Sequence, residues 1–405
     1  MAIARFKVKR CLLLPVTSKE NNMTTTRQRN ILVTGSDGLI GWHLRALLKT
    51  LGDNVNVIPC NRQQFADDQY LSDAIENANV IVHLAGMNRG EEEEIVQTNI
   101  ALAQRITEIC QQLDCKPHII YSSSTHIDGD SRYGYSKRVA GETFEAWGQS
   151  EEAPFLNLVL PHVFGEHGKP NYNSAVSTFA YKLVNGETPE VTGNGQVELL
   201  HAHDVAQIVW DSIVDGTDGE LRPHGCKMSV TELLERLKRL SDRYLEEGVV
   251  PETNEAIDLK LFNTIRSYIP YEKRAIDLTL HSDERGNLFE AARADNQGQV
   301  FLSTSHPGIT RGEHFHFRKV ERFLVIQGQA KIRMRRVLKD EVITYEVSGD
   351  KPQAIDIPTL HTHNITNVGD TPLLTLFWAG EHFDPDNSDT YPMIVEIPTT
   401  QSAPA

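Results

Sequence analysis

The chain has 405 residues, of which 40% are hydrophobic and 23% are charged, and its formal net charge is −15. This length exceeds what one ordinary hydrophobic core accommodates, so two domains are expected. The negative charge argues against nucleic acid and acidic membrane surfaces as partners, and no apolar run approaches the roughly 20 residues of a membrane span.

Residues 1–28 place basic side chains before a short apolar patch, Cys11 to Val16, which contains Pro15. The patch is too short for a secretion signal. The segment is therefore expected to be a disordered extension, or to precede a true start at Met23. Five cysteines are scattered at positions 11, 60, 110, 115 and 226 without a pairing motif, which indicates a reducing, cytoplasmic location.

Strand and helix patterns alternate from Asn30 onward. Strands are expected at 30–35, 54–60, 80–86, 118–124 and 155–161, and helices at 39–52, 70–78, 95–113 and 231–248. Such alternation predicts an α/β fold, with a Rossmann-like doubly wound parallel sheet covered by helices on both faces. The four glutamates at 91–94 are interpreted as a solvated helix start.

A glycine-rich segment follows the first expected strand. "TGSDGLIG" places Gly35, Gly38 and Gly41 at the turn from a strand to a helix. Glycines let the backbone approach a pyrophosphate at the N-terminus of a helix. A glycine triplet alone is weak evidence, but its position between a strand and an amphipathic helix favours dinucleotide binding.

The end of the second strand indicates the type of dinucleotide. NAD-dependent enzymes usually place an acid there, on the ribose hydroxyl, whereas this chain has "IPCNRQQF" with Arg62 and no acid. An arginine at this position suits a 2′-phosphate, so NADPH is favoured over NADH. The alternative is that Arg62 is an ordinary surface charge.

Tyr133 and Lys137 stand four residues apart in "YSSSTHIDGDSRYGYSK", after a strand that ends in serines. Residues four apart on a helix share a face. A lysine ammonium beside a phenol lowers the pKa of the phenol and makes it a usable acid or base. Ser122, Ser123 and Ser124 can each accompany this pair, and we select Ser124.

This arrangement resembles the extended short-chain dehydrogenase/reductase superfamily over roughly residues 30–270. Further matching landmarks are "HLAG" (83–86), Asn99 and "LPHVFG" (160–165). The resemblance implies that Tyr133 transfers the proton, that Lys137 lowers the pKa of Tyr133 and holds the ribose, and that Ser124 polarises the substrate oxygen.

The resemblance also implies the cofactor site. Its expected residues are Gly35, Ser36, Asp37, Gly38, Leu39, Ile40, Gly41, Asn61, Arg62, Leu84, Ala85, Gly86, Tyr133 and Lys137. Nucleotide-sugar 4,6-dehydratases of this superfamily carry Thr-Asp-Glu where this chain has "SSTH". Because that acid pair is missing, reduction or epimerisation is expected rather than dehydration.

After Asp283 the pattern changes to short β-rich runs at 299–305, 322–337, 342–350 and 373–380. These predict an all-β domain, such as a small barrel or jelly roll. In "GITRGEHFHFRKVERFLVIQG" (308–328), His314 and His316 share one face of an extended strand. "PTLHTHNITN" supplies His361 and His363 downstream.

The two segments resemble the two-part signature of the cupin superfamily over about residues 280–398. This implies one divalent metal on His314, His316, Glu321 and His363. Three nitrogens and one oxygen suit Zn, Fe, Mn or Ni, and zinc is expected. His361 competes with His363, but the spacing to Asn367 favours His363. Leu360 stands where the family usually has glycine, and the alternative is a barrel whose interior histidines bind no metal.

Four segments are thus expected. They are an extension (1–28), a Rossmann domain (29–272), a cupin jelly-roll β-barrel domain (273–398) and a tail (399–405). We expect the two domains to have separate cores, so that loss of one leaves the other folded.

The combination of domains is more specific than either one. It resembles the CapF-type capsular polysaccharide biosynthesis enzymes along nearly the whole chain beyond residue 29, through "HLAGMNR", "KPNYNSAVSTFAYKL", "TRGEHFH", "IDIPTLHTHNITNVGDT" and "FDPDNSDTY". The resemblance implies a UDP-linked 2-acetamido-2,6-dideoxy-hexos-4-ulose substrate, on the route to UDP-N-acetyl-L-fucosamine. The cupin would invert C3 and the reductase domain would then reduce the C4 ketone with NADPH. Asn171 and Asn173 are expected to contact the substrate, and a homodimer or larger homo-oligomer is expected.

The chemistry dictates the order of the two steps. A C3 proton is acidic only while C4 is a ketone, so epimerisation must precede reduction. A metal could stabilise the enolate or could hold the pocket structurally. Rhamnose-type 3,5-epimerases use the histidine of an "RG-x-H" motif as base. The equivalent His314 cannot serve while it binds metal, so Lys319, His306 and Tyr391 are candidates.

Two other functions remain open from the sequence. One is a single-activity reductase or 4-epimerase whose cupin only dimerises or senses a ligand. The other is a non-catalytic protein that binds nucleotide sugars, which the Ser-Tyr-Lys set argues against.

Overall fold

The computed structural model describes residues 28–191, 195–253, 255–278, 281–283, 286–288, 293–295, 298–381 and 384–396. The extension expected before residue 28 and the tail expected over 399–405 lie outside these ranges. Among the residues that the structure describes, no helix combines the length and apolar character needed to cross a membrane.

The N-terminal part is built on a six-stranded parallel sheet with the order β2-β1-β3-β4-β5-β8. Its strands are β1 (Arg29–Thr34), β2 (Val55–Cys60), β3 (Val80–His83), β4 (His118–Ser124), β5 (Phe155–Leu160) and β8 (Gly219–Leu221). The strand order reverses between β1 and β3, and doubly wound sheets bind ligands at such a switch point. The predicted Rossmann-like α/β fold is confirmed.

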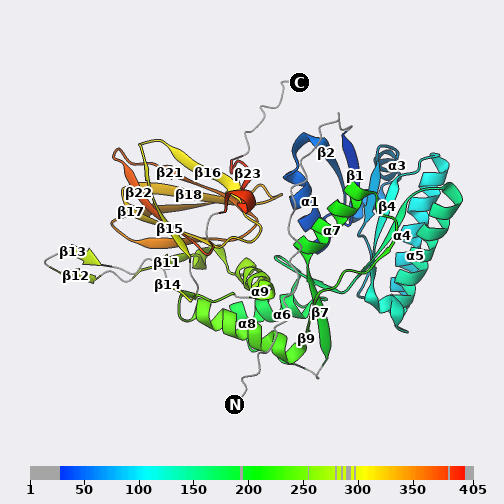
Figure 1. The fold of residues 1–405 in the computed structure, drawn as a ribbon, viewed down its shortest axis with the longest axis horizontal. Coiled ribbons are helices and arrows are strands. Elements are labelled where there is room, and N and C mark those ends of the chain that lie inside the picture. Colours follow the sequence, from blue (N-terminus) through cyan, green and yellow to red (C-terminus); the bar gives the residue numbers. More distant parts are fainter. Residues whose placement is uncertain are drawn as a thin grey trace, which may run out of the picture.

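Helices cover both faces of this sheet (Figure 1). One face carries α1 (Leu39–Lys49) and α7 (Ala202–Asp215), and the other carries α3 (Asp68–Glu76), α4 (Glu92–Gln112) and α5 (Arg132–Glu151), with the short α2 (Arg62–Ala66) after β2. Ile31 and Val33 of β1 pack on the α1 side, whereas Leu32 packs on the opposite side. A strand buried on both faces is apolar throughout, which explains why these strands were predictable.

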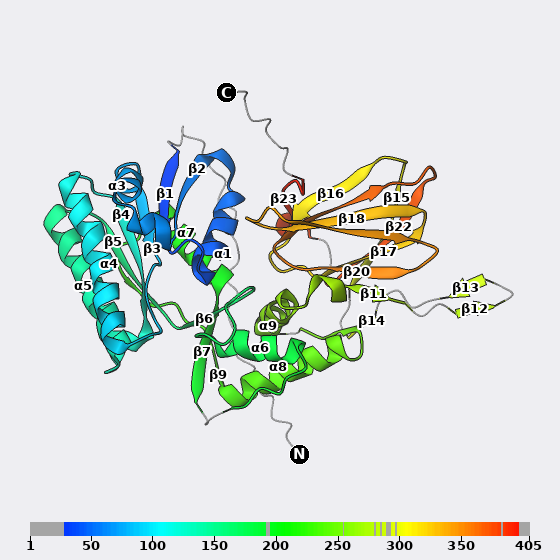
Figure 2. The same ribbon diagram turned by 180° about the vertical axis from the view of Figure 1, so that it is seen from behind.

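A smaller unit follows, with a three-stranded sheet and three helices (Figure 2). It contains β6 (His162–Phe164), β7 (Gln196–His201), β9 (Cys226–Ser229), α6 (Ala175–Val184), α8 (Val230–Leu245) and α9 (Ala256–Ser267). The sequence predicted only α8 of these elements. The helices form one apolar cluster that also includes Val320 and Trp378 of the C-terminal part.

The C-terminal part consists of two five-stranded antiparallel sheets, with the orders β11-β20-β17-β22-β15 and β19-β18-β21-β16-β23. The first contains β11 (Ala275–Asp277), β20 (Gln353–Ile357), β17 (Glu321–Gln327), β22 (Leu373–Ala379) and β15 (Gln299–Ser305). The second contains β19 (Val342–Ser348), β18 (Gln329–Arg336), β21 (His361–Asn367), β16 (Thr310–Phe315) and β23 (Tyr391–Pro392). This confirms the predicted all-β domain.

Four short strands lie outside these sheets. The hairpin of β12 (His281–Asp283) and β13 (Gly286–Leu288) projects away from the barrel (Figure 1), and β10 (Val249–Val250) pairs with β14 (Arg293–Ala294). The boundary at 272/273 stays a prediction. In the structure α9 ends at Ser267 and the first barrel strand begins at Ala275.

The two parts do not have separate cores, contrary to the expectation. Phe315, Phe317 and Leu360 of the barrel belong to the same buried apolar cluster as Trp42 and α7. Polar contacts cross the same boundary. They are Arg266 Nη2 to the Ile357 carbonyl (2.6 Å), Asn263 Nδ2 to the Arg318 carbonyl (2.9 Å) and Thr359 Oγ1 to Glu166 Oε1 (3.3 Å). Sequence periodicity cannot reveal such a contact, because it reports only which residues are buried.

Leu360 explains one departure from the cupin pattern. Its φ is 59°, in the left-handed region that favours glycine, and it is 1% exposed within the shared apolar cluster. A left-handed conformation costs a non-glycine residue about 1–2 kcal/mol. Burial of a leucine side chain contributes about 1.5–3 kcal/mol. The burial offsets the backbone strain, so the leucine is tolerated because the N-terminal part covers it.

Candidate functional sites

The glycine turn lies at the end of β1, against the end of β3. Gly35 has a φ of +65°, and a Cβ there would be 2.8 Å from the backbone nitrogen of Ala85. A Cβ on Gly41 would be 2.4 Å from the Gly35 carbonyl oxygen. Both positions therefore require glycine. Gly38 is the N-cap of α1, so this turn presents a helix N-terminus beside residues 84–86, as an anion site requires.

The end of β2 is joined to the same turn. The backbone N–H of Ser36 donates to the Cys60 carbonyl (3.3 Å). Asn61 is the N-cap of α2 and forms a reciprocal capping box with Gln64, so its side chain already has a structural role. Arg62 is the first residue of α2 and is exposed. Its side chain is therefore accessible to solvent on the helix that follows β2.

Ser124 and Tyr133 meet at the end of β4. Burial raises the pKa of Tyr133 to about 12, and this outweighs the opposing effect of the neighbouring Ser124 side chain, which lowers that pKa. Ser122 Oγ instead donates to the His83 carbonyl (3.2 Å), and Ser123 is buried. Of the three candidate serines, the structure therefore places Ser124 beside the phenol.

Lys137 lies one turn further along α5 and is 5% exposed. Burial lowers the pKa of Lys137 to about 7. Its ammonium lies 4.5 Å from the ring centroid of Tyr121. The expected lowering of the Tyr133 pKa by Lys137 is not seen, because burial dominates at Tyr133 and Lys137 points towards Tyr121.

Asn99 holds the loop after β3 in place. Its Oδ1 accepts from the Met87 N–H (2.6 Å), and its Nδ2 donates to the Met87 carbonyl (2.8 Å) and to Ser136 Oγ (2.9 Å). The sequence indicated Asn99 only as a landmark. A buried amide on an otherwise apolar helix face was the available signal, because buried polar groups need partners.

The loop between β6 and α6 approaches the Tyr133 site. Asn171 has a φ of 53°, and its carbonyl accepts from Arg89 Nη1 (2.7 Å). The Tyr172 ring lies 5.8 Å from the Arg89 guanidinium and 5.1 Å from the Lys169 ammonium, and the proximity of Tyr172 also raises the pKa of Tyr133. Asn171 and Asn173 are exposed. The sequence patterns did not identify Arg89, Lys169 and Tyr172 as residues of this site.

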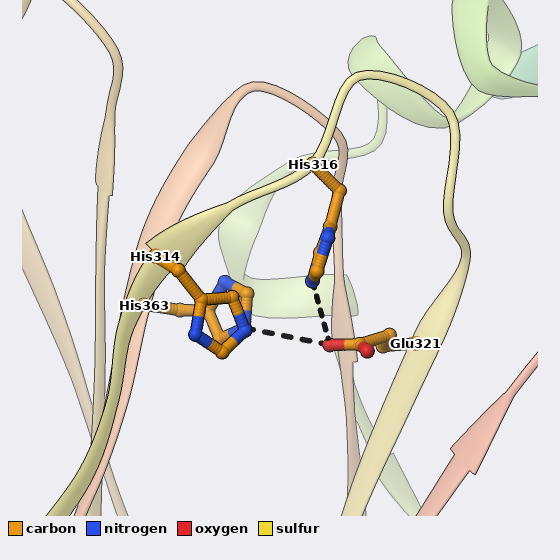
Figure 3. Close-up of side chains that lie close together, drawn as sticks. All are labelled: His314, His316, Glu321 and His363. Carbon is orange, nitrogen blue, oxygen red and sulfur yellow. Dashed lines mark ion pairs between the residues drawn. The ribbon is translucent and has the colours of Figure 1, made fainter. Parts of the chain in front are cut away.

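A second site lies in the barrel, where His314, His316, Glu321 and His363 converge (Figure 3). One ligand atom of each lies within 4.8 Å of all the others. Glu321 Oε2 is 3.0 Å from His316 Nε2 and 3.4 Å from His363 Nε2. A β-bulge between Gly312 and His314 directs the latter, because bulges re-aim side chains.

The charges of this cluster are coupled. Burial lowers the pKa of His314 to about 4, assisted by the neighbouring histidines. Burial would lower the pKa of His316, but Glu321 raises it overall. Burial would raise the pKa of Glu321, but His316 and His363 hold it well below its ordinary value. A partly buried carboxylate that faces three imidazoles is a cation-binding arrangement.

His361 does not join the cluster. Its Nε2 is 2.8 Å from the Tyr271 hydroxyl, and its Nδ1 is 2.9 Å from the Thr359 carbonyl. His363 is the cross-strand neighbour of His314 on β16. The geometry therefore brings together the four residues expected as metal ligands.

The three candidate bases are differently placed. The Tyr391 ring stacks on Phe315 (5.4 Å) and touches Phe317 (5.0 Å). Because Phe315 follows His314 in β16 and points to the opposite face of the strand, Tyr391 lies on that other face, away from the cluster. Lys319 donates to the Ser388 carbonyl (2.8 Å), and His306 is exposed in the turn before β16. None of the three shares a contact with Glu321 among the described hydrogen bonds.

Comparisons with known proteins match both parts of the chain. Residues 31–220 match the NAD dependent epimerase/dehydratase family, and residues 281–391 match the polysaccharide biosynthesis C-terminal domain. The chain is 32% identical over 368 residues to UDP-2-acetamido-2,6-beta-L-arabino-hexul-4-ose reductase from Pseudomonas aeruginosa, covering 89% of this chain and 97% of that protein.

Comparison with solved structures gives the same family. Capsular polysaccharide assembling protein CapF from Staphylococcus aureus shares 32% identity, with a TM-score of 0.58 and coverage of 90% of this chain and 100% of that chain. WbmF from Bordetella bronchiseptica, solved with NADH, is 18% identical with a TM-score of 0.51, over 61% of this chain and 93% of that one, and shows the fold alone. Relatives at 32% identity thus align with both parts at once, and the chain belongs to the CapF family of capsular polysaccharide biosynthesis enzymes.

Proposed function

We propose that this chain epimerises C3 and then reduces the C4 ketone of a UDP-linked 2-acetamido-2,6-dideoxy-hexos-4-ulose, with NADPH as reductant. At the coarser level, it is a nucleotide-sugar enzyme of the reductase and epimerase type in polysaccharide biosynthesis. The observation that supports two steps is the presence of two chemically distinct sites, the Ser124–Tyr133–Lys137 set and the His-Glu cluster, in one chain. Both small molecules of the proposed reaction, a nucleotide sugar and NADPH, fit a cytoplasmic enzyme.

The Rossmann part would carry out the reduction. The cofactor pyrophosphate would lie at the glycine turn, and Tyr133 would give its phenolic proton to the C4 oxygen as hydride arrives at C4. Ser124 would donate a hydrogen bond to the same oxygen. Lys137 would hold the ribose. Arg89 and Lys169 are the exposed cations beside this site, and they would suit the diphosphate of the substrate.

The barrel would carry out the epimerisation. The buried Nε2 atoms of His316 and His363 have no hydrogen-bond partner of good geometry among the described residues, so the cluster fits a divalent cation held by His314, His316, Glu321 and His363. When bound, such a cation would polarise the C4 ketone and favour loss of the C3 proton. With the other three ligands, Glu321 would keep the ion fixed beside the sugar.

One experiment tests both steps. The purified protein is incubated with the UDP-4-keto sugar and NADPH in heavy water, and the product is followed by NMR. Deuterium at C3 together with hydride at C4 is the expected result. A reduced product without C3 deuterium would instead support a single-activity reductase whose barrel is not catalytic, which the lack of an identified base favours as the second candidate. No NADPH consumption would support a binding protein.

The cofactor preference depends on Arg62. Arg62→Ala should weaken NADPH binding much more than NADH binding, because only NADPH offers a 2′-phosphate. A charge-assisted hydrogen bond contributes about 1.5–3 kcal/mol, which corresponds to about tenfold to a hundredfold in Kd. The Kd of each cofactor is measured by fluorescence titration of the wild-type protein and the variant. The exposed neighbour Gln63 provides the control, since Gln63→Ala should alter neither Kd, and equal losses for both cofactors in Arg62→Ala would refute the assignment.

We also propose that the chain forms a homodimer through the edge of the barrel. β15 is the edge strand of its sheet, and Val300 and Leu302 on its outer face are 57% and 69% exposed. Exposed apolar edge strands favour pairing with another chain. Leu302→Lys should shift the protein to a monomer in light scattering after size exclusion, whereas Val368→Lys, at an exposed apolar residue in a turn, should not. An unchanged mass in Leu302→Lys would exclude this surface.

A further inference from the structure

The C-terminal segment after the last long barrel strand carries a buried acid next to the metal-type cluster. Asp389 lies between the 3-10 turn η4 (Pro385–Asn387) and β23, and it is 5% exposed with a φ of 46°. It is part of "FDPDNSDTY", a segment with no role in the reaction steps proposed above. A buried carboxylate in a left-handed conformation indicates that its surroundings hold it in place.

The carboxylate of Asp389 organises the turn that separates two of the cluster residues. Its Oδ1 accepts from the backbone N–H of Phe317 (3.1 Å). Its Oδ2 accepts from those of Arg318 (2.9 Å) and Lys319 (2.8 Å). Three successive backbone N–H groups thus converge on one carboxylate, an arrangement that binds anions well. The turn runs from His316 to Glu321, so its shape sets the separation of those two side chains.

The backbone of Asp389 contacts the cluster itself. Its carbonyl oxygen accepts from Nδ1 of His316 (2.6 Å). Nδ1 is therefore the donor in this bond, which leaves Nε2, 3.0 Å from Glu321 Oε2, as the nitrogen that would bind an ion. Metal-binding histidines generally need such an acceptor on the second ring nitrogen, which fixes both the tautomer and the ring orientation.

Neighbouring contacts hold the same two segments together. Lys319 Nζ donates to the Ser388 carbonyl (2.8 Å), and Arg318 Nη2 donates to the Asn387 carbonyl (2.8 Å). Each of these bonds involves one side chain of the turn, whereas the Asp389 carboxylate accepts from three backbone N–H groups of the turn. The Asp389 side chain is thus the group through which the C-terminal segment determines the position of the turn.

We propose that Asp389 is a positioning residue for the divalent metal of the barrel. Its carboxylate holds the turn from Phe317 to Lys319, and its carbonyl aims His316 Nε2 at the ion. This inference rests on the proposed metal site and adds a residue, 73 positions from His316 in the chain, that the spacing of the ligands does not reveal.

The test compares Asp389→Asn with Asp386→Asn, a change at an exposed acid in the same segment. In Asp389→Asn the new amide keeps the size of the side chain but has one acceptor oxygen where the carboxylate has two, so at least one N–H group of the turn loses its partner. Zinc affinity is measured by competition with a chromogenic chelator. Loss of an outer contact to a metal ligand costs about tenfold to a hundredfold in affinity, so this loss is expected for Asp389→Asn, with wild-type affinity for Asp386→Asn.

Two further measurements separate positioning from stability. The absorption spectrum of the cobalt-loaded protein reports the ligand geometry and should change in Asp389→Asn, while NADPH binding should stay unchanged and show that the chain is folded. If Asp389→Asn has a lower melting temperature but wild-type zinc affinity and cobalt spectrum, the inference about Asp389 is overturned while the proposed metal site stands. A wild-type protein that binds neither metal would overturn the proposed metal site and the inference with it.

Discussion

Tyr133→Phe should stop NADPH oxidation with the keto sugar while C3 exchange continues. In the proposed mechanism the phenol would supply the proton that the C4 oxygen needs when hydride arrives, and phenylalanine would keep the ring but remove that proton. General acid catalysis contributes typically about 10²–10⁴-fold, so a loss of at least about a hundredfold in kcat is expected. The proposed exchange reaction would use the barrel, which the substitution leaves untouched. NADPH absorbance measures the first activity, and NMR in heavy water measures the second.

Tyr135→Phe is the matched control for this variant. Tyr135 lies on the same helix but is 40% exposed and contacts Arg132 and Arg138 on the surface. The control variant should therefore reduce the sugar at the wild-type rate. Normal NADPH turnover in Tyr133→Phe would remove Tyr133 from the mechanism. Loss of exchange together with reduction would show that the two sites are not independent.

Removing one metal ligand should lower the metal content of the protein. His314→Ala and His363→Ala each leave three ligands, so reduced occupancy is expected rather than complete loss, starting from about one zinc per chain. His361→Ala should keep its metal, because His361 is bonded to Tyr271 and Thr359 instead. Elemental analysis of the purified variants measures the number of metal ions per chain. Equal metal loss in all three would contradict the ligand set, and so would a metal-free wild type with full C3 exchange.

Chelation separates a catalytic metal from a structural one. If the metal is catalytic, a chelator should stop C3 exchange without a change in the melting temperature of the barrel. If it is structural, the loss of exchange should follow a fall in that temperature. Because Phe315, Phe317 and Leu360 share a core with the Rossmann part, NADPH binding must be measured in the same samples to detect any disturbance of the neighbouring site.

The shared core changes how domain-level experiments should be read. Glu166 is 1% exposed, lies 3.0 Å from His201 and accepts from Thr359 of the barrel. Burial would raise the pKa of Glu166, but His201 and His43 lower it to about 2. The carboxylate is thus charged within the interface, and a Rossmann part expressed alone would leave this charge without its barrel partner at a bare apolar surface.

The sequence by itself determined the fold class, the glycine turn, the Tyr133–Lys137 pair and the histidine-rich strand. These signals are local. Strands buried on both faces are continuous apolar runs, helix partners recur every four residues, and alternate residues of a strand share a face. Each can be recognised within a few consecutive residues, without knowledge of what packs against them.

Only the tertiary structure decided the remaining questions, because they depend on contacts between distant segments. His361 and His363 lie on the same face of β21, so alternation could not choose between them. The spacing to Asn367 favoured His363, and the structure adds the cross-strand pairing of His363 with His314. Tyr391 lies away from the histidine cluster, because β23 pairs with β16 in a register that stacks its ring on Phe315. The positive φ of Leu360 is tolerated because another domain buries its side chain, and that packing leaves no periodic trace in the sequence.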